Sequence, residues 1–182
     1  LGKAITLPAL EAGADIDPAL VKRIIDDMKG EPGALPLMSF ALQDLFAAEK
    51  MAPGRPMDLT LAEYVQRSGI ESALERHANA VFAGFSDEQQ ALARGIFSRL
   101  IETGQGRLDT RRTATFEELV PAGGDRALVA ATVAELAEAN ARLVTTSGAG
   151  EAGAEALLAG KAMVTIAHEK LIDAWPWLRR LV

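Results

Sequence analysis

His168, in the stretch MVTIAHEKLIDAW (163–175), is the residue best suited to chemistry by its type and its position. The residues before His168 predict a strand over 161–167, and those after it predict a helix. His168 would therefore lie beside a helix N-terminus, where backbone N–H groups have no partner within the helix. Such a terminus attracts anions, and an imidazole beside it can donate a charge-assisted hydrogen bond to one. The alternative is that His168 and Glu169 only cap the helix.

Pro36 is a second candidate, at the end of the sequence GALP (33–36) and at the predicted start of another helix near Leu35. A proline at a helix start offers a rigid apolar ring and has no N–H that needs a partner, so it suits contact with a flat base. The alternative is that Pro36 simply begins the helix.

The other potential catalytic patterns are incomplete. The two histidines, His77 and His168, do not have the spacing of a metal-binding H-E-x-x-H helix. Near AGKA (159–162), Glu155 stands where a phosphate loop has its first glycine, and Ala162 stands where it has Ser or Thr. No G-x-S-x-G stretch is present. We therefore expect no catalytic residue and no metal site, so that the chain is not an enzyme on its own.

Three further features have expected roles. His77 is expected to pack or to lie at the surface of a helix over 70–82. Arg111 and Arg112 are adjacent in a predicted strand and would point to opposite faces, so that one lies in solvent while the other could meet an anion or an acidic patch. Trp175 and Trp177 are expected to cover a core, with a kink or restart of the helix at Pro176.

The composition narrows the class of protein. The chain has 182 residues, is 49% hydrophobic and has no cysteine, which predicts a folded protein without disulfides and fits the cytoplasm. No apolar run reaches the roughly 18 residues of a membrane span. A net charge of −6 argues against a protein that grips phosphate backbones. We expect a cytoplasmic protein with neither a membrane nor a nucleic-acid partner, and its start at Leu1 suggests a piece of a longer protein.

The first 84 residues predict a wholly helical subdomain. Asp17 and Pro18 begin a helix that Gly30 ends, and Thr60 with Glu63 forms a capping box for a short one. The Pro- and Gly-rich residues 51–58 are predicted to be a loop.

Residues 85–182 predict a different unit. The expected order is a helix from Ser86, a strand over 107–115, a short helix, a helix over 125–139 and two strands over 142–146 and 161–167, with a mobile loop between the last two. This is the element order of a winged-helix domain. The predicted fold class is therefore mainly α with a small antiparallel β-sheet: a helical lid-like subdomain over 1–84, then a winged-helix domain over 85–182.

A winged-helix transcription regulator with a helical sensing or dimerisation domain is the alternative function. Residues 86–182 contain 11 basic and 13 acidic side chains, and the helix over 125–139 carries Glu135 and Glu138 against one Arg126. This charge would repel DNA. A third possibility is a structural adaptor that binds proteins and never a nucleotide.

Several stretches together resemble a known family: GEPGALPLMSFALQDLF (30–46), TIAHEKLIDAWPWLRRL (165–181), residues 60–101 and DTRRTATFEELV (109–120). They are similar to the regulatory half of the novel STAND NTPase type 1 group, whose members are often joined to WD-repeat propellers. The resemblance covers nearly the whole chain. It implies a helical lid and a winged helix that follow a phosphate-loop ATPase core, and the core is absent from these residues.

The resemblance also implies nucleotide-binding residues. Gly33 and Pro36 are similar to the G-x-P element of STAND lids, whose proline lies against adenine. His168 is similar to the histidine of the M-H-D element, which touches the β-phosphate of ADP, although Ala167 and Glu169 replace the flanking Met and Asp. The implied cofactors are ADP and ATP, with magnesium bound by the core only. The implied partners are the chain's own N-terminal ATPase core and a downstream repeat domain, and the implied activity is to clamp ADP and hold a signalling protein closed.

Overall fold

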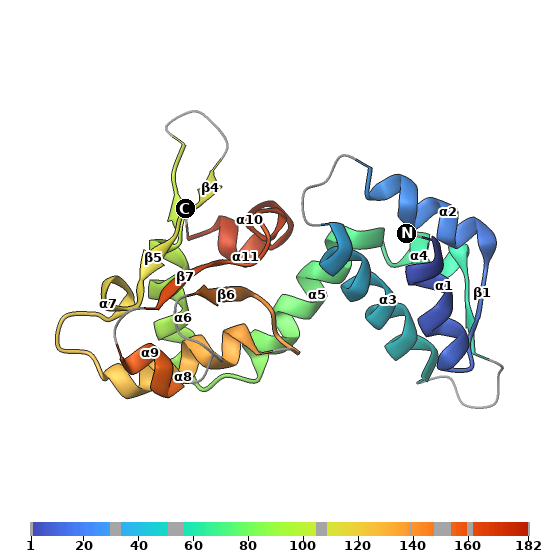
Figure 1. Ribbon diagram of the computed structural model, residues 1–182. Helices are drawn as coiled ribbons and strands as arrows, with labels where there is room; N and C mark the ends of the chain where they lie inside the picture. Colours follow the sequence, from blue (N-terminus) through green and yellow to red (C-terminus); the bar gives the residue numbers. More distant parts are fainter. Residues whose placement is uncertain are drawn as a thin grey trace. The chain divides into compact units, whose positions relative to one another are not determined.

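The computed structural model describes residues 2–29, 34–50, 57–104, 109–138, 140–147, 154–159 and 162–181 (Figure 1). The chain divides into two compact units, Leu1–His77 and Ala78–Val182, and the division falls inside helix α5 (Gly69–Ala83). The domain boundary expected at residues 84 and 85 stays a prediction. Each unit is described by itself below.

The first unit is mainly helical, as predicted. It contains α1 (Gly2–Glu11), α2 (Pro18–Asp27), α3 (Ala34–Lys50), α4 (Leu61–Gln66) and the first part of α5. The predicted helix starts are confirmed, because Asp17 accepts the Ala19 N–H at the start of α2 and Thr60 accepts the Glu63 N–H at the start of α4. The buried side chains include Ile5, Leu20, Ile24, Leu45 and Leu74.

A short parallel pairing corrects the expectation that this unit is wholly helical. β1 (Asp15–Ile16) pairs with β2 (Asp58–Leu59), and Leu59 is buried. Two-residue strands are too short to show an alternating pattern, so no signal for them could be recognised in the sequence. Residue 58, the last of the predicted loop, is in β2, and residues 51–56 and Gly30 lie outside the described residues.

The second unit places helices against a small antiparallel sheet. Its helices are α6 (Asp87–Arg99), α7 (Phe116–Leu119), α8 (Arg126–Ala137), α9 (Ala154–Leu158), α10 (Lys170–Ala174) and α11 (Pro176–Arg179). β5 (Ala114–Thr115), β7 (Met163–Ile166) and β6 (Val144–Ser147) form a sheet in that order, with both pairings antiparallel. The predicted fold class, mainly α with a small antiparallel sheet, is confirmed, and the winged-helix assignment stays a prediction.

Two expectations for this unit are wrong in detail. The single strand predicted over 107–115 is two strands, because β4 (Thr110–Arg111) pairs with β3 (Ile101–Glu102) whereas β5 pairs with β7. The loop predicted between the last two strands contains α9, whose Leu157 is fully buried and which packs against α8 (Figure 1). Burial of this one leucine favours a helix in a segment whose composition suggested a loop. Residues 148–153, 160 and 161 lie outside the described residues.

The tryptophans cover the core of the second unit, as predicted. Trp175 is fully buried and donates from Nε1 to the Asn79 Oδ1 at 2.8 Å. Its ring stacks on Trp177, with centroids 4.5 Å apart, and meets Phe97 edge-on. α10 ends before Trp175, and α11 restarts with Pro176 at its first position. Among the described helices, none is both long and apolar enough for a membrane span.

Candidate functional site

His168 lies between β7 and α10 on a backbone that hydrogen bonds hold at both sides. The preceding Ala167 N–H donates to the Leu143 carbonyl at 3.0 Å. The His168 carbonyl accepts the Leu171 N–H at 3.0 Å, and the Glu169 carbonyl accepts the Ile172 N–H at 2.9 Å. The side chain of His168 is half-buried. The strand and the first helical turn therefore fix the backbone position from which the His168 side chain extends.

The electrostatic reason given for His168 from the sequence needs correction. α10 has only 5 residues, little more than one turn, so few peptide dipoles are aligned to attract an anion. Glu169 has helical backbone angles and its side chain makes no capping hydrogen bond, so the alternative in which it caps the helix by its side chain is not supported either. A positive potential at His168 must come from other groups.

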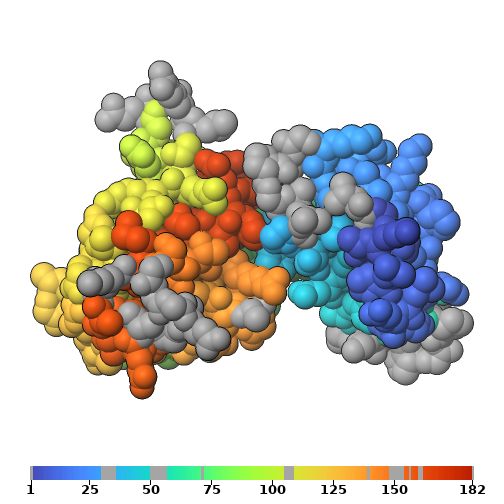
Figure 2. All heavy atoms as spheres, in the orientation of Figure 1, coloured from blue at the N-terminus to red at the C-terminus, as the bar shows by residue number. Residues whose placement is uncertain are grey.

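Arginine side chains supply that potential. The Arg111 guanidinium donates to the Ala167 carbonyl at 3.4 Å, which places β4 beside the residue before His168. In Figure 2 the yellow-green atoms around β4 lie next to the red atoms of the C-terminal helices. Burial lowers the pKa of His168 below its usual value, and the positive charges of Arg111 and Arg142 lower it further. Burial and the two arginines therefore both disfavour the protonated form of His168.

Arg142 was not singled out by sequence reasoning. It follows α8 in a turn with φ of 47°, in the left-handed region that favours glycine. Its N–H donates to the Glu138 carbonyl at 2.9 Å, and the next residue, Leu143, donates to the Leu136 carbonyl at 2.9 Å. In the sequence Arg142 is the first residue of the strand predicted over 142–146, whereas β6 begins at Val144 and Arg142 lies in the turn before it. Its proximity to His168 arises from the pairing of β6 with β7.

Arg112 differs from its neighbour in its partners, although it lies just after β4 and both side chains are exposed, so the prediction of opposite strand faces stays a prediction. Its guanidinium pairs with Glu118 and also donates to the Arg99 carbonyl at 3.1 Å. Arg112 therefore contributes to the fold of the second unit, while Arg111 faces the segment that carries His168.

Pro36 is the third residue of α3 and its side chain is half-buried. It lies in the first helical turn, where a missing N–H costs no intrahelical hydrogen bond. Gly33 lies outside the described residues. Pro36 belongs to the first unit and His168 to the second, so the convergence of the two on one nucleotide stays a prediction.

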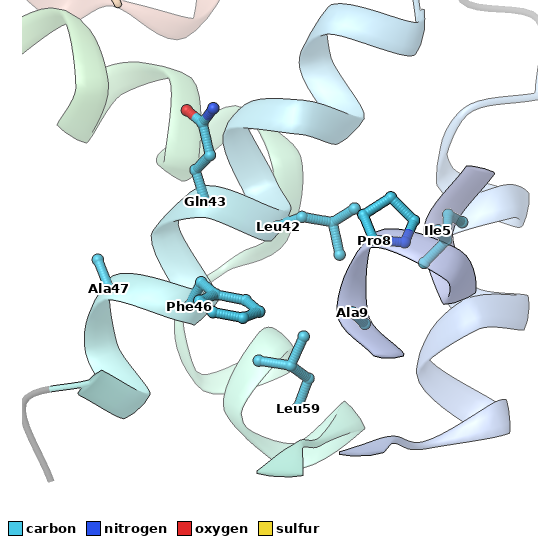
Figure 3. Close-up of a pocket in the computed structure, with 8 residues that line it drawn as sticks. All are labelled: Ile5, Pro8, Ala9, Leu42, Gln43, Phe46, Ala47 and Leu59. Atoms are coloured by element: carbon cyan, nitrogen blue, oxygen red, sulfur yellow. The ribbon is translucent and has the colours of Figure 1, made fainter. Parts of the chain in front are cut away.

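The first unit contains an apolar pocket away from Pro36. It has a volume of about 350 Å³ and is lined by residues of α1, α3 and β2: Ile5, Pro8, Ala9, Leu42, Gln43, Phe46, Ala47 and Leu59 (Figure 3). Leu42 lies six residues after Pro36, about 9 Å along the helix axis. The pocket is thus a feature of the α1 and α3 contact and does not include the proline that the sequence singled out.

A carboxylate between two arginines lies elsewhere in the first unit. Asp44 accepts hydrogen bonds from Arg67 at 2.7 and 2.8 Å and from Arg76 at 3.0 and 2.7 Å. Burial alone would raise the pKa of Asp44, but the hydrogen bonds from both arginines outweigh it and lower the pKa to about 2. A hollow of about 480 Å³ beside the arginines is also lined by Glu49 and Glu63, so its charge does not favour an anion.

Two further expectations concern histidine and metal. His77 stacks on Phe40 with ring centroids 4.3 Å apart, which confirms its packing role. Within the part of the chain that the structure describes, no group of three or more His, Cys, Asp or Glu side chains is arranged to hold a metal ion.

The comparison with protein families identifies the class of this chain. A helical protein with a half-buried histidine among arginines is compatible with many classes, but one family model, described as Novel STAND NTPase 1, matches residues 1–182, the whole chain. The class is thus that of STAND NTPase-related domains. The chain belongs to the novel STAND NTPase 1 family, as its motifs suggested. No curated protein and no solved structure matches it.

Proposed function

We propose that this chain is the regulatory lid and winged-helix part of a cytoplasmic STAND signalling ATPase, and that it clamps ADP and holds the protein closed. Pro36, with Gly33 before it, lies against the adenine, and His168 binds the β-phosphate. Hydrolysis and magnesium binding belong to an ATPase core outside this chain, so the chain is not an enzyme on its own. A downstream repeat domain is its other partner.

The observation that carries the proposal is the surroundings of His168. The two arginines near the half-buried His168 supply positive charge for an anion, and the imidazole can donate an N–H to it. Burial and the arginines lower the pKa of His168, and a bound anion would raise it again by favouring the protonated form. The β-phosphate of ADP is an anion of this kind. Membership of a family of nucleoside triphosphatases supports this choice of ligand.

A single histidine contact is too weak to shift the protein between its closed and open states on its own. Changing a two-state equilibrium from 99:1 to 1:99 takes about 5.5 kcal/mol of differential binding, whereas one charge-assisted hydrogen bond contributes about 1.5–3 kcal/mol. Apolar packing against the core must supply the remainder. Leu7 and Leu10, one helical turn apart on α1, are 53% and 60% exposed, and they provide apolar surface for such a contact.

The alternative, a winged-helix regulator of transcription, has less support. A helix that reads DNA must present a free basic face to the major groove. α8 is packed against α6, α9 and β6. Its Arg126 pairs with Glu117, and its Glu135 accepts hydrogen bonds from the Gln89 side-chain amide at 3.1 Å.

The test uses the full-length protein that contains this chain and measures its affinity for a fluorescent ADP analogue. His168→Gln removes the charge that protonation supplies and is expected to weaken binding about tenfold, the effect of one charge-assisted hydrogen bond. Pro36→Ala should weaken ADP and AMP binding alike, because both contain adenine. His77→Gln, which alters the histidine stacked on Phe40, is the matched control and should leave ADP affinity unchanged. Equal affinities for the His168→Gln and His77→Gln proteins would contradict the proposal.

A further inference from the structure

Arg111 and Arg142 are drawn from separate parts of the second unit to one place. Arg111 is in β4, and Arg142 is in the turn between α8 and β6. The segment 166–168 joins them, because Ala167 accepts from the Arg111 guanidinium while its own N–H donates to Leu143, next to Arg142. Both arginine side chains are exposed. The two cations thus flank the residue whose ring is proposed to meet a phosphate.

The fold makes little use of either guanidinium. Arg111 makes one long hydrogen bond, 3.4 Å, to a carbonyl oxygen. Among the described residues, neither Arg111 nor Arg142 forms an ion pair, whereas the adjacent Arg112 pairs with Glu118. Bringing positive charges together without an acidic partner raises the free energy of the folded protein. An anion bound among them would remove that cost.

The backbone at Arg142 adds an independent observation. Its φ of 47° is a conformation that glycine adopts without steric cost and that is unfavourable for other residues. The turn alone would therefore be more stable with glycine. Arg142 is therefore unfavourable for the free energy of folding through both its backbone conformation and its charge. Its side chain is what distinguishes it from the glycine that would suit the turn.

We infer that Arg111 and Arg142 bind the diphosphate group of the nucleotide together with His168, so that this unit recognises the phosphate end of ADP through three side chains from β4, the turn before β6 and the β7–α10 junction. This inference rests on the proposed function and adds two binding residues to it. Each guanidinium can donate two hydrogen bonds to phosphate oxygens in a fixed geometry. The affinity that the two arginines supply therefore depends on the β-phosphate, which ADP has and AMP lacks.

The experiment measures the dissociation constants of ADP and AMP for the full-length protein and its variants. Arg111→Gln and Arg142→Gly are each expected to weaken ADP binding about tenfold, the loss of a charge-assisted contact, and to change AMP binding by less than about twofold. Arg94→Gln, which removes the same charge from an exposed position on α6, is the control and should leave both constants unchanged. Thermal unfolding separates binding from folding, because Arg142→Gly relieves the left-handed turn and should not lower the midpoint.

The outcomes separate this inference from the proposed function. The inference is overturned if Arg111→Gln and Arg142→Gly bind ADP as Arg94→Gln does, or if both variants weaken ADP and AMP equally. Should His168→Gln weaken ADP binding while the two arginine variants do not, the inference fails and the proposed function stands. Unchanged ADP affinity in all three variants would contradict both the inference and the proposed function.

Discussion

The two units use arginine in opposite ways. In the first unit, Arg67 and Arg76 donate four hydrogen bonds to the single carboxylate of Asp44, whose side chain is only 17% exposed. In the second unit, Arg111 and Arg142 approach a half-buried histidine, and neither forms an ion pair with a described residue. The same type of side chain is neutralised by a carboxylate of the chain in one place and has no acidic partner among the described residues in the other.

This difference distinguishes a structural charge cluster from a candidate binding site. In the first cluster the acidic partner belongs to the chain, its pKa falls to about 2, and the hydrogen bonds join α3 with α4 and α5. In the second, burial and the neighbouring arginine charges lower the pKa of His168 and so disfavour its protonated form. A bound anion would reverse that effect, as the proposed function requires.

The largest expected effect is on the first cluster. Asp44→Asn leaves Arg67 and Arg76 close together without a carboxylate, and should lower the free energy of unfolding by about 2 kcal/mol, in the range for hydrogen bonds to charged groups. Urea denaturation measures it. Because folding lowers the pKa of Asp44, the stability that its carboxylate contributes is present above pH 3.8 and is lost as the pH falls toward 2. The Asp44→Asn protein should not show this loss.

Asp15→Asn is the control for this experiment, because Asp15 is an exposed residue of the same unit. Equal losses of stability for Asp44→Asn and Asp15→Asn would show that the Asp44 cluster does not stabilise the fold, and the contrast between the two clusters would then fail.

A smaller effect is expected from the titration of His168. Its pKa is lower in the folded protein than the ordinary 6.5, so the unfolded chain binds the proton more readily. The stability that His168 contributes is present above pH 6.5 and is lost as the pH falls through the lower, folded value. His168→Gln should therefore flatten the dependence of unfolding free energy on pH as the pH falls below 6.5. If His168→Gln keeps the wild-type dependence of stability on pH, His168 is not the group that causes it. His77→Gln is the control variant.

The smallest effect on stability is expected from the arginines of the second cluster. Arg111→Gln and Arg142→Gln should each change the free energy of unfolding by no more than about 0.5 kcal/mol, as for surface positions without a structural contact. The direction should be toward greater stability, since one positive charge is removed from a positive group, and added salt should reduce the difference. Chemical denaturation at low and high salt tests this. A clear loss of stability in either variant would assign the arginine to the fold rather than to a ligand.

Much of the local structure could be predicted because it depends on neighbours in sequence. The caps at Asp17 and Thr60, the break before Pro176 and the approximate positions of β6 and β7 follow from side-chain chemistry within a few residues. The β1–β2 pairing and α9 could not be predicted, because Leu59 and Leu157 gain their burial from segments distant in sequence. The site shows the same division: His168 was evident from its motif, but Arg142 was not, since a left-handed turn gives no chemical signal at an arginine.

The sequence by itself determined the family and the helical class, and it singled out Pro36 and His168 as candidates, because motifs and apolar periodicity are properties of the chain order. The tertiary structure alone decided which charges meet. The pairing of β6 with β7 and the contact of Arg111 with Ala167 bring two cations from separate segments to one histidine, while helix packing in the other unit gives its arginines a carboxylate. The physical reason is that Coulomb interactions depend on distance in space, and distance in space is set by packing.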